Sequence, residues 1–244
     1  MAGSCNVAII TGGGYGIGRA AALQAAAQGW TIVVVDVDPT KAAETQNKIA
    51  QSGGRAAAVA GDVTDARTAE RAVTSAKELG IIKGLVNCAA MRHPGPITQI
   101  TEAQWDETIS VILKGVFLFC RAAIPEMIGN GGGSIVNVSS ADASGRKNMV
   151  AYASAKGAVN TLTLCLAADH LQDRIRVNTV IPGFTLTGMT EHYSQARLNE
   201  MSSKFVAGRP GEPDDVANII RFLLSDESET VTGGFFGGQT LAMR

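Results

Sequence analysis

The chain has 244 residues, a formal net charge of −1 and 45% hydrophobic residues. This apolar content excludes a disordered chain, and the near-neutral charge argues against a nucleic-acid-binding protein, which usually carries a basic surface. No apolar run approaches the roughly 20 residues that cross a bilayer, and residues 1–5 show no signal peptide, so we expect a cytoplasmic protein without a membrane partner.

Short β-branched runs alternate with longer helical patterns along the chain. The sequence predicts strands at 7–11, 31–36, 56–60, 85–87, 134–139 and 176–181, and helices at 18–28, 40–52, 66–79, 109–127, 150–171, 191–205 and 213–224. This alternation is typical of an α/β fold with three α/β/α layers, a doubly wound parallel sheet of the Rossmann type. No linker divides the chain, so we predict a single domain over residues 1–244, with residues 187–205 as a possible substrate lid.

The cysteines and histidines indicate no metal site. Cys5, Cys88, Cys120 and Cys165 form no Cys-x-x-Cys pair and lie among apolar neighbours. They are expected to be small buried side chains in a reducing compartment. The three histidines also lack metal-ligand spacing.

A glycine-rich loop joins the first predicted strand to the first helix. Gly12, Gly16 and Gly18 give the spacing Gly-x-x-x-Gly-x-Gly. Glycines let backbone N–H groups approach a pyrophosphate, and a helix N-terminus favours its negative charge. A tight turn also uses glycine, but here the loop lies between a strand and a helix, and Asp36 ends the next strand.

The charge at Asp36 indicates which nucleotide is bound. A carboxylate at this position can accept hydrogen bonds from the adenosine ribose hydroxyls and repels a 2′-phosphate. No Arg or Lys adjoins Asp36 in sequence, and the glycine loop presents Tyr15 rather than a cation. The pattern favours NAD over NADP; the structural alternative is a helix-capping or solvated Asp36.

In order and spacing, these motifs resemble the short-chain dehydrogenase/reductase family over nearly the whole chain. Thr11 opens the glycine loop, residues 87–90 resemble the family's Asn-Asn-Ala-Gly, residues 135–140 resemble its fifth strand, and Tyr152 and Lys156 form its Tyr-x-x-x-Lys signature. The resemblance implies a cofactor site formed by Gly12, Tyr15, Gly16, Ile17, Gly18, Asp36, Asp62, Val63, Asn87, Ala89, Tyr152, Lys156, Pro182, Gly183, Thr185 and Thr187.

Tyr152 and Lys156 carry the predicted proton chemistry. A helix puts residues four apart on one face, about one turn from each other. A free tyrosine has a pKa near ~10, and a neighbouring ammonium and an oxidised nicotinamide both lower it. We predict that Tyr152 is the general acid/base and that Lys156 lowers its pKa and binds the nicotinamide ribose.

A serine hydroxyl near the carbonyl oxygen would orient the substrate and share its developing charge. The family's usual distance from the tyrosine selects Ser139, whereas alignment on the strand motif selects Ser140. We predict Ser140 as the catalytic serine, because strand register is harder to change than loop length.

One position departs from the family's pattern. The fourth catalytic residue of the family is an Asn in the long central helix, and this chain has Ile112 there. In the family that Asn helps to hold a water linking the lysine to solvent, whereas an isoleucine side chain cannot hydrogen-bond. Either the relay is replaced and the enzyme is active, as we predict, or catalysis is weak and the chain mainly binds NAD.

The residues facing the substrate are expected in loops that follow the strands. These loops supply Arg92, His93 and Phe184, together with Arg146 and Lys147. The basic side chains favour a small polar or anionic substrate such as a sugar, polyol or hydroxy acid; alternatively, they are merely solvated.

The predicted function is an NAD-dependent oxidoreductase that interconverts a secondary alcohol and a ketone or aldehyde. A binding relative with little catalysis is one alternative, and an epimerase or dehydratase is another that the short length disfavours. The resemblance also implies a homotetramer, with helices near 109–127 and 150–171 at one interface. Gly237 comes earlier than in the family, which implies a shorter connection before the last strand and a departure from the family in that strand and in its subunit contact.

Overall fold

A single sheet of seven parallel strands forms the centre of the protein. The computed structural model describes residues 5–190, 193–202 and 205–237. The strand order is β3-β2-β1-β4-β5-β6-β7. The strands are β1 (Asn6–Thr11), β2 (Thr31–Asp36), β3 (Ala56–Ala60), β4 (Ile81–Asn87), β5 (Gly133–Val138), β6 (Ile175–Ile181) and β7 (Phe235–Gly237). The predicted doubly wound α/β fold is therefore confirmed.

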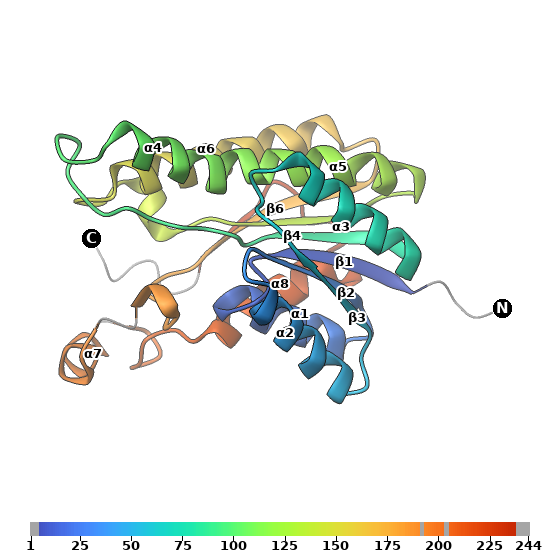
Figure 1. Ribbon diagram of the computed structural model, residues 1–244, viewed down its shortest axis with the longest axis horizontal. Helices are drawn as coiled ribbons and strands as arrows, with labels where there is room; N and C mark the ends of the chain where they lie inside the picture. The colour runs from blue at the N-terminus through green and yellow to red at the C-terminus, as the bar shows by residue number, and fades with distance from the viewer. Residues whose placement is uncertain (1–4, 191–192, 203–204, 238–244) are drawn as a thin grey trace.

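Helices cover both faces of the sheet (Figure 1). One layer contains α1 (Gly16–Ala27), α2 (Pro39–Gln51) and α8 (Pro213–Leu224), and the other contains α3 (Ala66–Leu79), α4 (Glu102–Ile109), α5 (Gly115–Gly129) and α6 (Val150–Asp169). The short helix α7 (Gln195–Ser202) stands apart from both layers, near the carboxyl ends of the strands.

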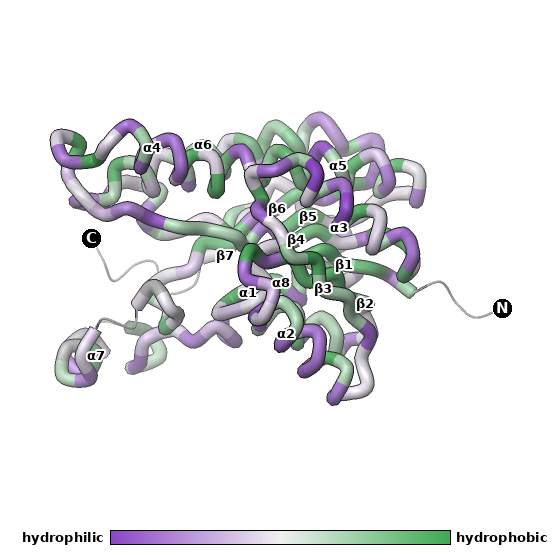
Figure 2. The backbone as a smooth tube through the Cα atoms, in the orientation of Figure 1, coloured by the Kyte–Doolittle hydropathy of each residue, from purple (hydrophilic) through white to green (hydrophobic). Residues whose placement is uncertain are grey.

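The strands are buried on both sides because their side chains point alternately to the two faces. In β1, Val7 and Ile9 belong to the core beneath α3, α5 and α6, whereas Ala8 and Ile10 belong to the core beneath α1 and α8. All four side chains are fully buried. The central strands accordingly form the most apolar part of the molecule (Figure 2).

The long central helix begins earlier than the sequence pattern predicts. Its first segment, α4, starts at Glu102 behind a capping box in which Thr101 and Gln104 satisfy each other's backbone N–H groups. A π-helical turn, Ser110–Lys114, joins α4 to α5. The polar residues of α4 hid this segment from the apolar pattern, although the Thr-x-x-Gln motif is a start signal.

This combined helix also corrects an expectation about membranes. Glu102–Gly129 spans 28 residues and has a mean hydropathy of 1.6 over its most apolar window, which is long and apolar enough to cross a bilayer. Half of that window is buried within the structure, and the core helices of soluble proteins share this composition. The absence of a membrane partner and the cytoplasmic location remain predictions.

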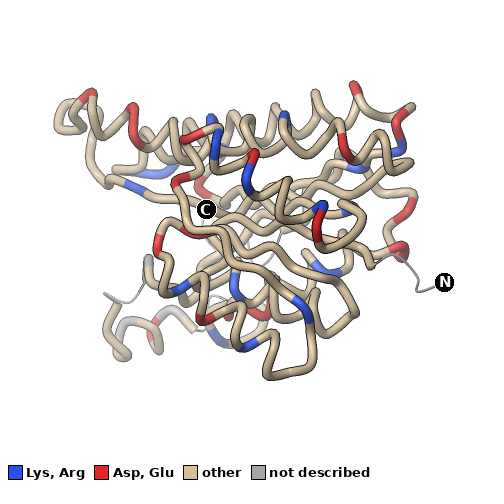
Figure 3. The backbone as a smooth tube through the Cα atoms, turned by 45° about the vertical axis from the view of Figure 1, so that its right-hand side comes forward, with Lys and Arg blue, Asp and Glu red and all other residues tan. Residues whose placement is uncertain are grey.

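The direction of the chain reverses between β1 and β4. From β1 the chain moves outward through β2 to β3, and it then returns to build β4 to β7 on the other side. In open parallel sheets this reversal leaves a crevice at the carboxyl ends of the two central strands. Acidic and basic residues are interspersed over most of the described chain (Figure 3), although α4 carries the acidic residues Glu102, Asp106 and Glu107 and no basic one.

Candidate active site

At the crevice between β1 and β4, the Thr11 hydroxyl joins the end of β1 to the loop that follows β4. The Thr11 hydroxyl oxygen accepts hydrogen bonds from the backbone N–H groups of Cys88 (3.0 Å) and Ala89 (3.2 Å). The next residue, Gly12, has φ +63°, and a Cβ there would lie 2.9 Å from the backbone of Ala89. Glycine is therefore required where the two loops meet.

The Asp36 carboxylate is held at the end of β2. One oxygen accepts a hydrogen bond from the Gly14 N–H (2.9 Å), and the other accepts one from the Asp38 N–H (3.0 Å). Asp36 also lines the main pocket, so these hydrogen bonds fix a carboxylate at one end of that pocket.

Two cations lie near the Tyr15 ring, although no Arg or Lys adjoins Asp36 in the sequence. The Tyr15 ring has the Arg19 guanidinium 5.8 Å from its centroid and the Lys41 ammonium 5.7 Å from it. Arg19 forms an ion pair with Glu44 at 2.8 Å. Both cations come from helices, α1 and α2, so inspection of the residues beside Asp36 could not find them.

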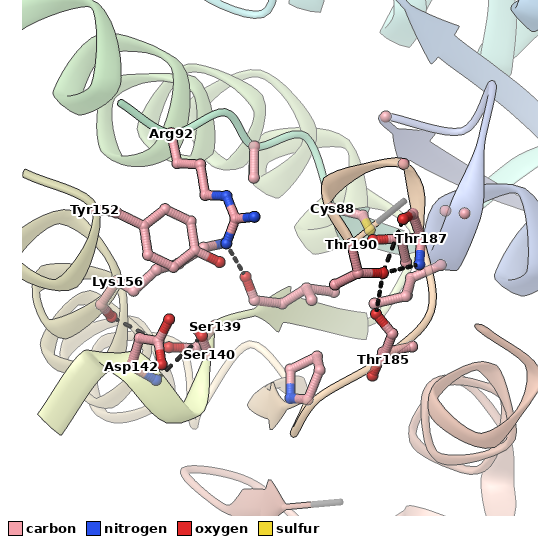
Figure 4. A pocket seen from close by; sticks show the side chains of 18 of the residues that line it. Cys88, Arg92, Ser139, Ser140, Asp142, Tyr152, Lys156, Thr185, Thr187 and Thr190 are labelled. Atoms are coloured by element: carbon pink, nitrogen blue, oxygen red, sulfur yellow. Dashed lines mark hydrogen bonds between the residues drawn. The ribbon is translucent and has the colours of Figure 1, made fainter. Parts of the chain in front are cut away.

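The pocket occupies about 400 Å³ at the carboxyl ends of the strands. Sixteen of the residues predicted for cofactor, substrate or catalysis line it, namely Gly12, Tyr15, Gly16, Ile17, Gly18, Asp36, Ala89, Arg92, Ser140, Tyr152, Lys156, Pro182, Gly183, Phe184, Thr185 and Thr187. Figure 4 shows Tyr152, Lys156 and the two serines on one side, and Thr185, Thr187 and Thr190 on the other.

The first turns of α6 bring Tyr152 and Lys156 into this pocket. The Lys156 ammonium lies 5.8 Å from the centroid of the Tyr152 ring and donates a hydrogen bond to the Val138 carbonyl oxygen at 2.5 Å. Only 2% of Lys156 is exposed, and burial lowers the pKa of its ammonium to about 8. Lys156 is therefore still mostly protonated at pH 7.

The Tyr152 hydroxyl is subject to opposing influences. Burial raises the pKa of this hydroxyl, and the charge of Asp142 acts in the same direction. A hydrogen bond with Ser140 and the positive charge of Arg92 both lower the pKa. The net effect is a Tyr152 pKa above the usual tyrosine value. An added positive charge in the pocket would lower this pKa and favour the phenolate.

The two candidate serines have different surroundings. Ser139 is 2% exposed, and its hydroxyl donates to the backbone carbonyl of Lys156 at 3.2 Å. The Ser140 hydroxyl interacts with Tyr152 and accepts a hydrogen bond from the Asp142 N–H at 3.1 Å. Both residues line the pocket, but Ser140 is the one whose hydroxyl meets the tyrosine.

This difference predicts separate effects for the two alanine substitutions. Ser140→Ala is expected to lower kcat by about 10- to 100-fold, because it removes a donor at the reacting oxygen. Ser139→Ala is expected to lower the free energy of unfolding by about 1 kcal/mol, with a smaller change in kcat. Steady-state kinetics and urea denaturation measure both effects; the opposite pattern would assign the catalytic role to Ser139.

Five residues predicted for the site do not line the pocket, and one of them, Lys147, is an exposed side chain of the loop after β5. Asn87 is 4% exposed, and its amide donates to the Asn137 side chain at 2.8 Å on the side of α5. Asp62 accepts from the Thr64 N–H (2.8 Å), and Val63 packs in the core. The His93 ring lies 2.8 Å from the Glu107 carboxylate of α4. Side chains of other elements surround Asn87, Val63 and His93, whereas Asp62 is held by a backbone N–H group of its own loop.

Two further lining residues are Ser139, the alternative catalytic serine, and Arg146 of the predicted substrate loops. The lining residues that were not predicted individually are Cys88, Ala90, Val138, Ala141, Asp142, Gly188, Thr190 and Tyr193. Burial raises the pKa of the Cys88 thiol to about 11, so this cysteine is not a thiolate at neutral pH. Most of these residues belong to the loops after β4, β5 and β6, and their position after a strand was the available signal.

Ile112 lies in the π-helical turn and is 1% exposed within the apolar core. Ile112→Asn is expected to lower the free energy of unfolding by about 2–4 kcal/mol, because it buries an amide and removes packing. Ile112→Val is the matched control, with a loss of about 1 kcal/mol. Turnover should not increase in either variant; a sharp increase in Ile112→Asn would mean that the relay is missing rather than replaced.

Comparisons with known proteins identify the family of this chain. A family profile described as enoyl-(acyl carrier protein) reductase matches residues 12–236. The chain is 38% identical to 2-(S)-hydroxypropyl-CoM dehydrogenase 3 of Xanthobacter autotrophicus, with 96% of each chain covered. It is a short-chain dehydrogenase/reductase.

Further relatives of this short-chain dehydrogenase/reductase include the human (3R)-3-hydroxyacyl-CoA dehydrogenase, which is 34% identical over 93% of this chain and 91% of the relative. The solved structure of a short-chain type dehydrogenase/reductase from Mycobacterium ulcerans has a TM-score of 0.89 at 32% identity, covering 97% of this chain and 90% of that one. The protein is accordingly an oxidoreductase related to dehydrogenases that act on hydroxyl groups.

Dehydrogenases of this family typically use a nicotinamide cofactor, and the residues present fit one. A side chain on Gly18 would collide with the carbonyl oxygen of Gly12, so the loop between β1 and α1 must stay free of side chains at this turn. Asp36 lies at the same end of the pocket as the loop, and Tyr152 and Lys156 lie in the same pocket. The loop offers backbone N–H groups for a pyrophosphate. The Asp36 carboxylate is suited to the adenosine ribose, and the Lys156 ammonium is suited to the nicotinamide ribose.

Proposed function

We propose that this short-chain dehydrogenase/reductase uses NAD to interconvert a secondary alcohol and a ketone or aldehyde. The observation that carries the proposal is the meeting of Ser140, Tyr152 and Lys156 in one pocket with the glycine loop. The names of the relatives, which are dehydrogenases of hydroxy compounds, support the same reaction class.

Tyr152 is the proton acceptor in the proposed oxidation. Its phenolate takes the hydroxyl proton while the C–H electron pair leaves the carbinol carbon as hydride, which leaves a C=O bond. A bound nicotinamide supplies the acceptor for that hydride and, in the reverse direction, its donor. In reduction, Tyr152 returns the proton to the carbonyl oxygen, so atoms and electrons balance in both directions.

Ser140 and Lys156 support this proton transfer. The Ser140 hydroxyl donates to the substrate oxygen and holds it beside Tyr152. Lys156 supplies positive charge near the tyrosine and can bind the nicotinamide ribose. Its hydrogen bond to Val138 and its burial fix the position of the ammonium before any ligand arrives.

Asp36 is the basis for proposing NAD over NADP. Its carboxylate would bind ribose hydroxyls and repel a 2′-phosphate. Lys41 and Arg19 near Tyr15 weaken that repulsion, but Arg19 is already paired with Glu44 and Lys41 lies 3.8 Å from Asp38. We therefore expect a preference for NAD that depends on Asp36.

A cofactor-coupled screen tests the proposed function. The protein is incubated with NAD or NADP and a panel of secondary alcohols, hydroxy acids and polyols, and the appearance of NADH or NADPH fluorescence is followed. Turnover with NAD well above NADP supports the proposal. Faster turnover with NADP would contradict the role of Asp36, and tight NADH binding without turnover of any compound would favour a binding protein.

We also propose that the protein is a homotetramer. Phe117 of α5 is 47% exposed and Leu164 of α6 is 46% exposed, and Cys165 beside Leu164 is exposed as well. Exposed apolar side chains on adjacent helices are typical of subunit interfaces. Light scattering coupled to gel filtration measures the oligomeric state, and a monomer would contradict the proposal.

A further inference from the structure

The loop that carries Arg92 is fastened at two points shortly after this residue. The His93 ring lies 2.8 Å from the Glu107 carboxylate of α4. The Gly95 N–H donates to the Asn148 carbonyl oxygen at 2.8 Å, and Gly95 forms a bridge with Met149. Because Met149 immediately precedes α6, the loop is tied to the helix that carries Tyr152.

This attachment places the Arg92 guanidinium beside the reactive tyrosine. Arg92 lines the pocket, and its charge acts on Tyr152. Figure 4 shows the guanidinium next to the Tyr152 ring, on the side away from Ser139 and Asp142. A group attached close to the carbinol carbon would therefore reach Arg92 while the hydroxyl lies at Tyr152.

The charged residues at this end of the pocket favour an anion. Arg92, Arg146 and Asp142 are the charged side chains that the described loops after β4 and β5 place in the lining. Arg146 forms an ion pair with Asp142 at 3.2 Å. These three side chains hold one more cation than anions, and the Lys156 ammonium of α6 adds a second positive charge on the same side of the pocket. A bound carboxylate would therefore meet a net positive charge.

Taken with the proposed oxidoreductase function, on which it rests, this arrangement leads us to propose that Arg92 binds a carboxylate of the substrate. The substrate class is then a hydroxy acid and the corresponding keto acid, with the carboxylate close to the reacting carbon. A guanidinium has only donors, arranged as a fork that matches the two oxygens of a carboxylate. Uncharged hydroxyls of a polyol would use this fork less well.

Matched substrates and variants test the role of Arg92. The substrates are 2- and 3-hydroxy acids and their methyl esters, which keep the carbinol and remove the charge. The variants are Arg92→Met, Arg92→Lys, and the control Lys147→Met, which removes an exposed cation outside the pocket lining. Two readouts are kcat/KM with NAD and calorimetric binding of the hydroxy acid to the enzyme saturated with NADH, a combination of two reduced partners that cannot react.

With wild-type protein we expect the acid to be preferred over its ester. Arg92→Met should lower kcat/KM for the acid and weaken its binding by about 10- to 100-fold, with less than about 3-fold change for the ester. Arg92→Lys should restore part of the loss, and Lys147→Met should leave both readouts within about 2-fold of wild type. NADH binding, measured by fluorescence, reports that each variant is folded.

The outcomes separate this proposal from the proposed function. Equal losses on acid and ester in Arg92→Met would mean that Arg92 acts on Tyr152 alone and would overturn carboxylate binding. Equal kcat/KM for acids and their methyl esters in the wild-type protein would also overturn carboxylate binding by Arg92. It would leave the proposed oxidoreductase function intact. Arg92-dependent binding of the acid without turnover would support the carboxylate site and contradict the proposed reaction.

Discussion

Tyr152→Phe is expected to lower kcat by about 100- to 10,000-fold, the usual contribution of a positioned general acid/base. The substitution removes only the hydroxyl that meets Ser140 and keeps the ring against Lys156. Without that hydroxyl no group at the same place can take the carbinol proton. Stopped-flow or steady-state detection of NADH measures the loss.

Cofactor binding distinguishes this loss from misfolding. The glycine loop and Asp36 lie at the other end of the pocket from the Tyr152 hydroxyl, so NADH affinity in Tyr152→Phe should stay within about 2-fold of wild type. The free energy of unfolding should fall by only about 1 kcal/mol, the usual effect of one lost hydrogen bond. Retained turnover would remove Tyr152 from the proposed mechanism.

Lys156→Met is expected to lower kcat by about 100-fold or more and yet to raise the stability of the protein at pH 7. A buried lysine with a pKa of about 8 instead of 10.5 holds its charge at pH 7 at a cost of about 3 kcal/mol. Methionine removes that cost. Methionine also leaves the Val138 carbonyl without its hydrogen-bond donor, and this loss offsets about 1–3 kcal/mol of the gain in the free energy of unfolding. We therefore expect a net gain of about 1 kcal/mol in urea denaturation.

The dependence of stability on pH provides the decisive control for this variant. As the pH rises through about 8, folded wild-type protein releases a proton that the unfolded chain retains up to about 10.5. The unfolded state then binds more protons, so the contribution of Lys156 to stability increases with pH across this window. Lys156→Met should lack this increase. Identical stability profiles for both proteins would contradict a buried, weakly basic Lys156.

The sequence predicted the fold well because its strands are continuous apolar runs buried on both faces. Strands and helices such as 56–60, 66–79 and 213–224 match the structure closely. It predicted the pocket lining nearly as well, because most motif residues follow the ends of strands. Asn87 and His93 lie outside the pocket lining, because a position at or after the end of a strand does not determine where the side chain points.

The sequence also did not predict contacts between side chains of separate helices and loops. The cations at Tyr15 come from α1 and α2, and no pattern in the glycine loop indicates them. The π-helical turn at Ser110–Lys114 likewise leaves no mark on apolar periodicity, because the neighbouring helical segments run on through it. Both features follow from packing in three dimensions, which local sequence does not contain.

The reversal of strand order between β1 and β4 has a consequence during synthesis. In the folded sheet β1 pairs with β2 on one side and with β4 on the other, and β4 begins only at Ile81. Until β4 has been synthesised, β1 can pair with β2 but has an open edge on its other side. An open edge of unpaired backbone groups on apolar strands is prone to join another chain. The emerging protein is therefore most vulnerable to aggregation between the completion of β3 and the arrival of β4, and a chaperone that shields apolar strands would act in that interval.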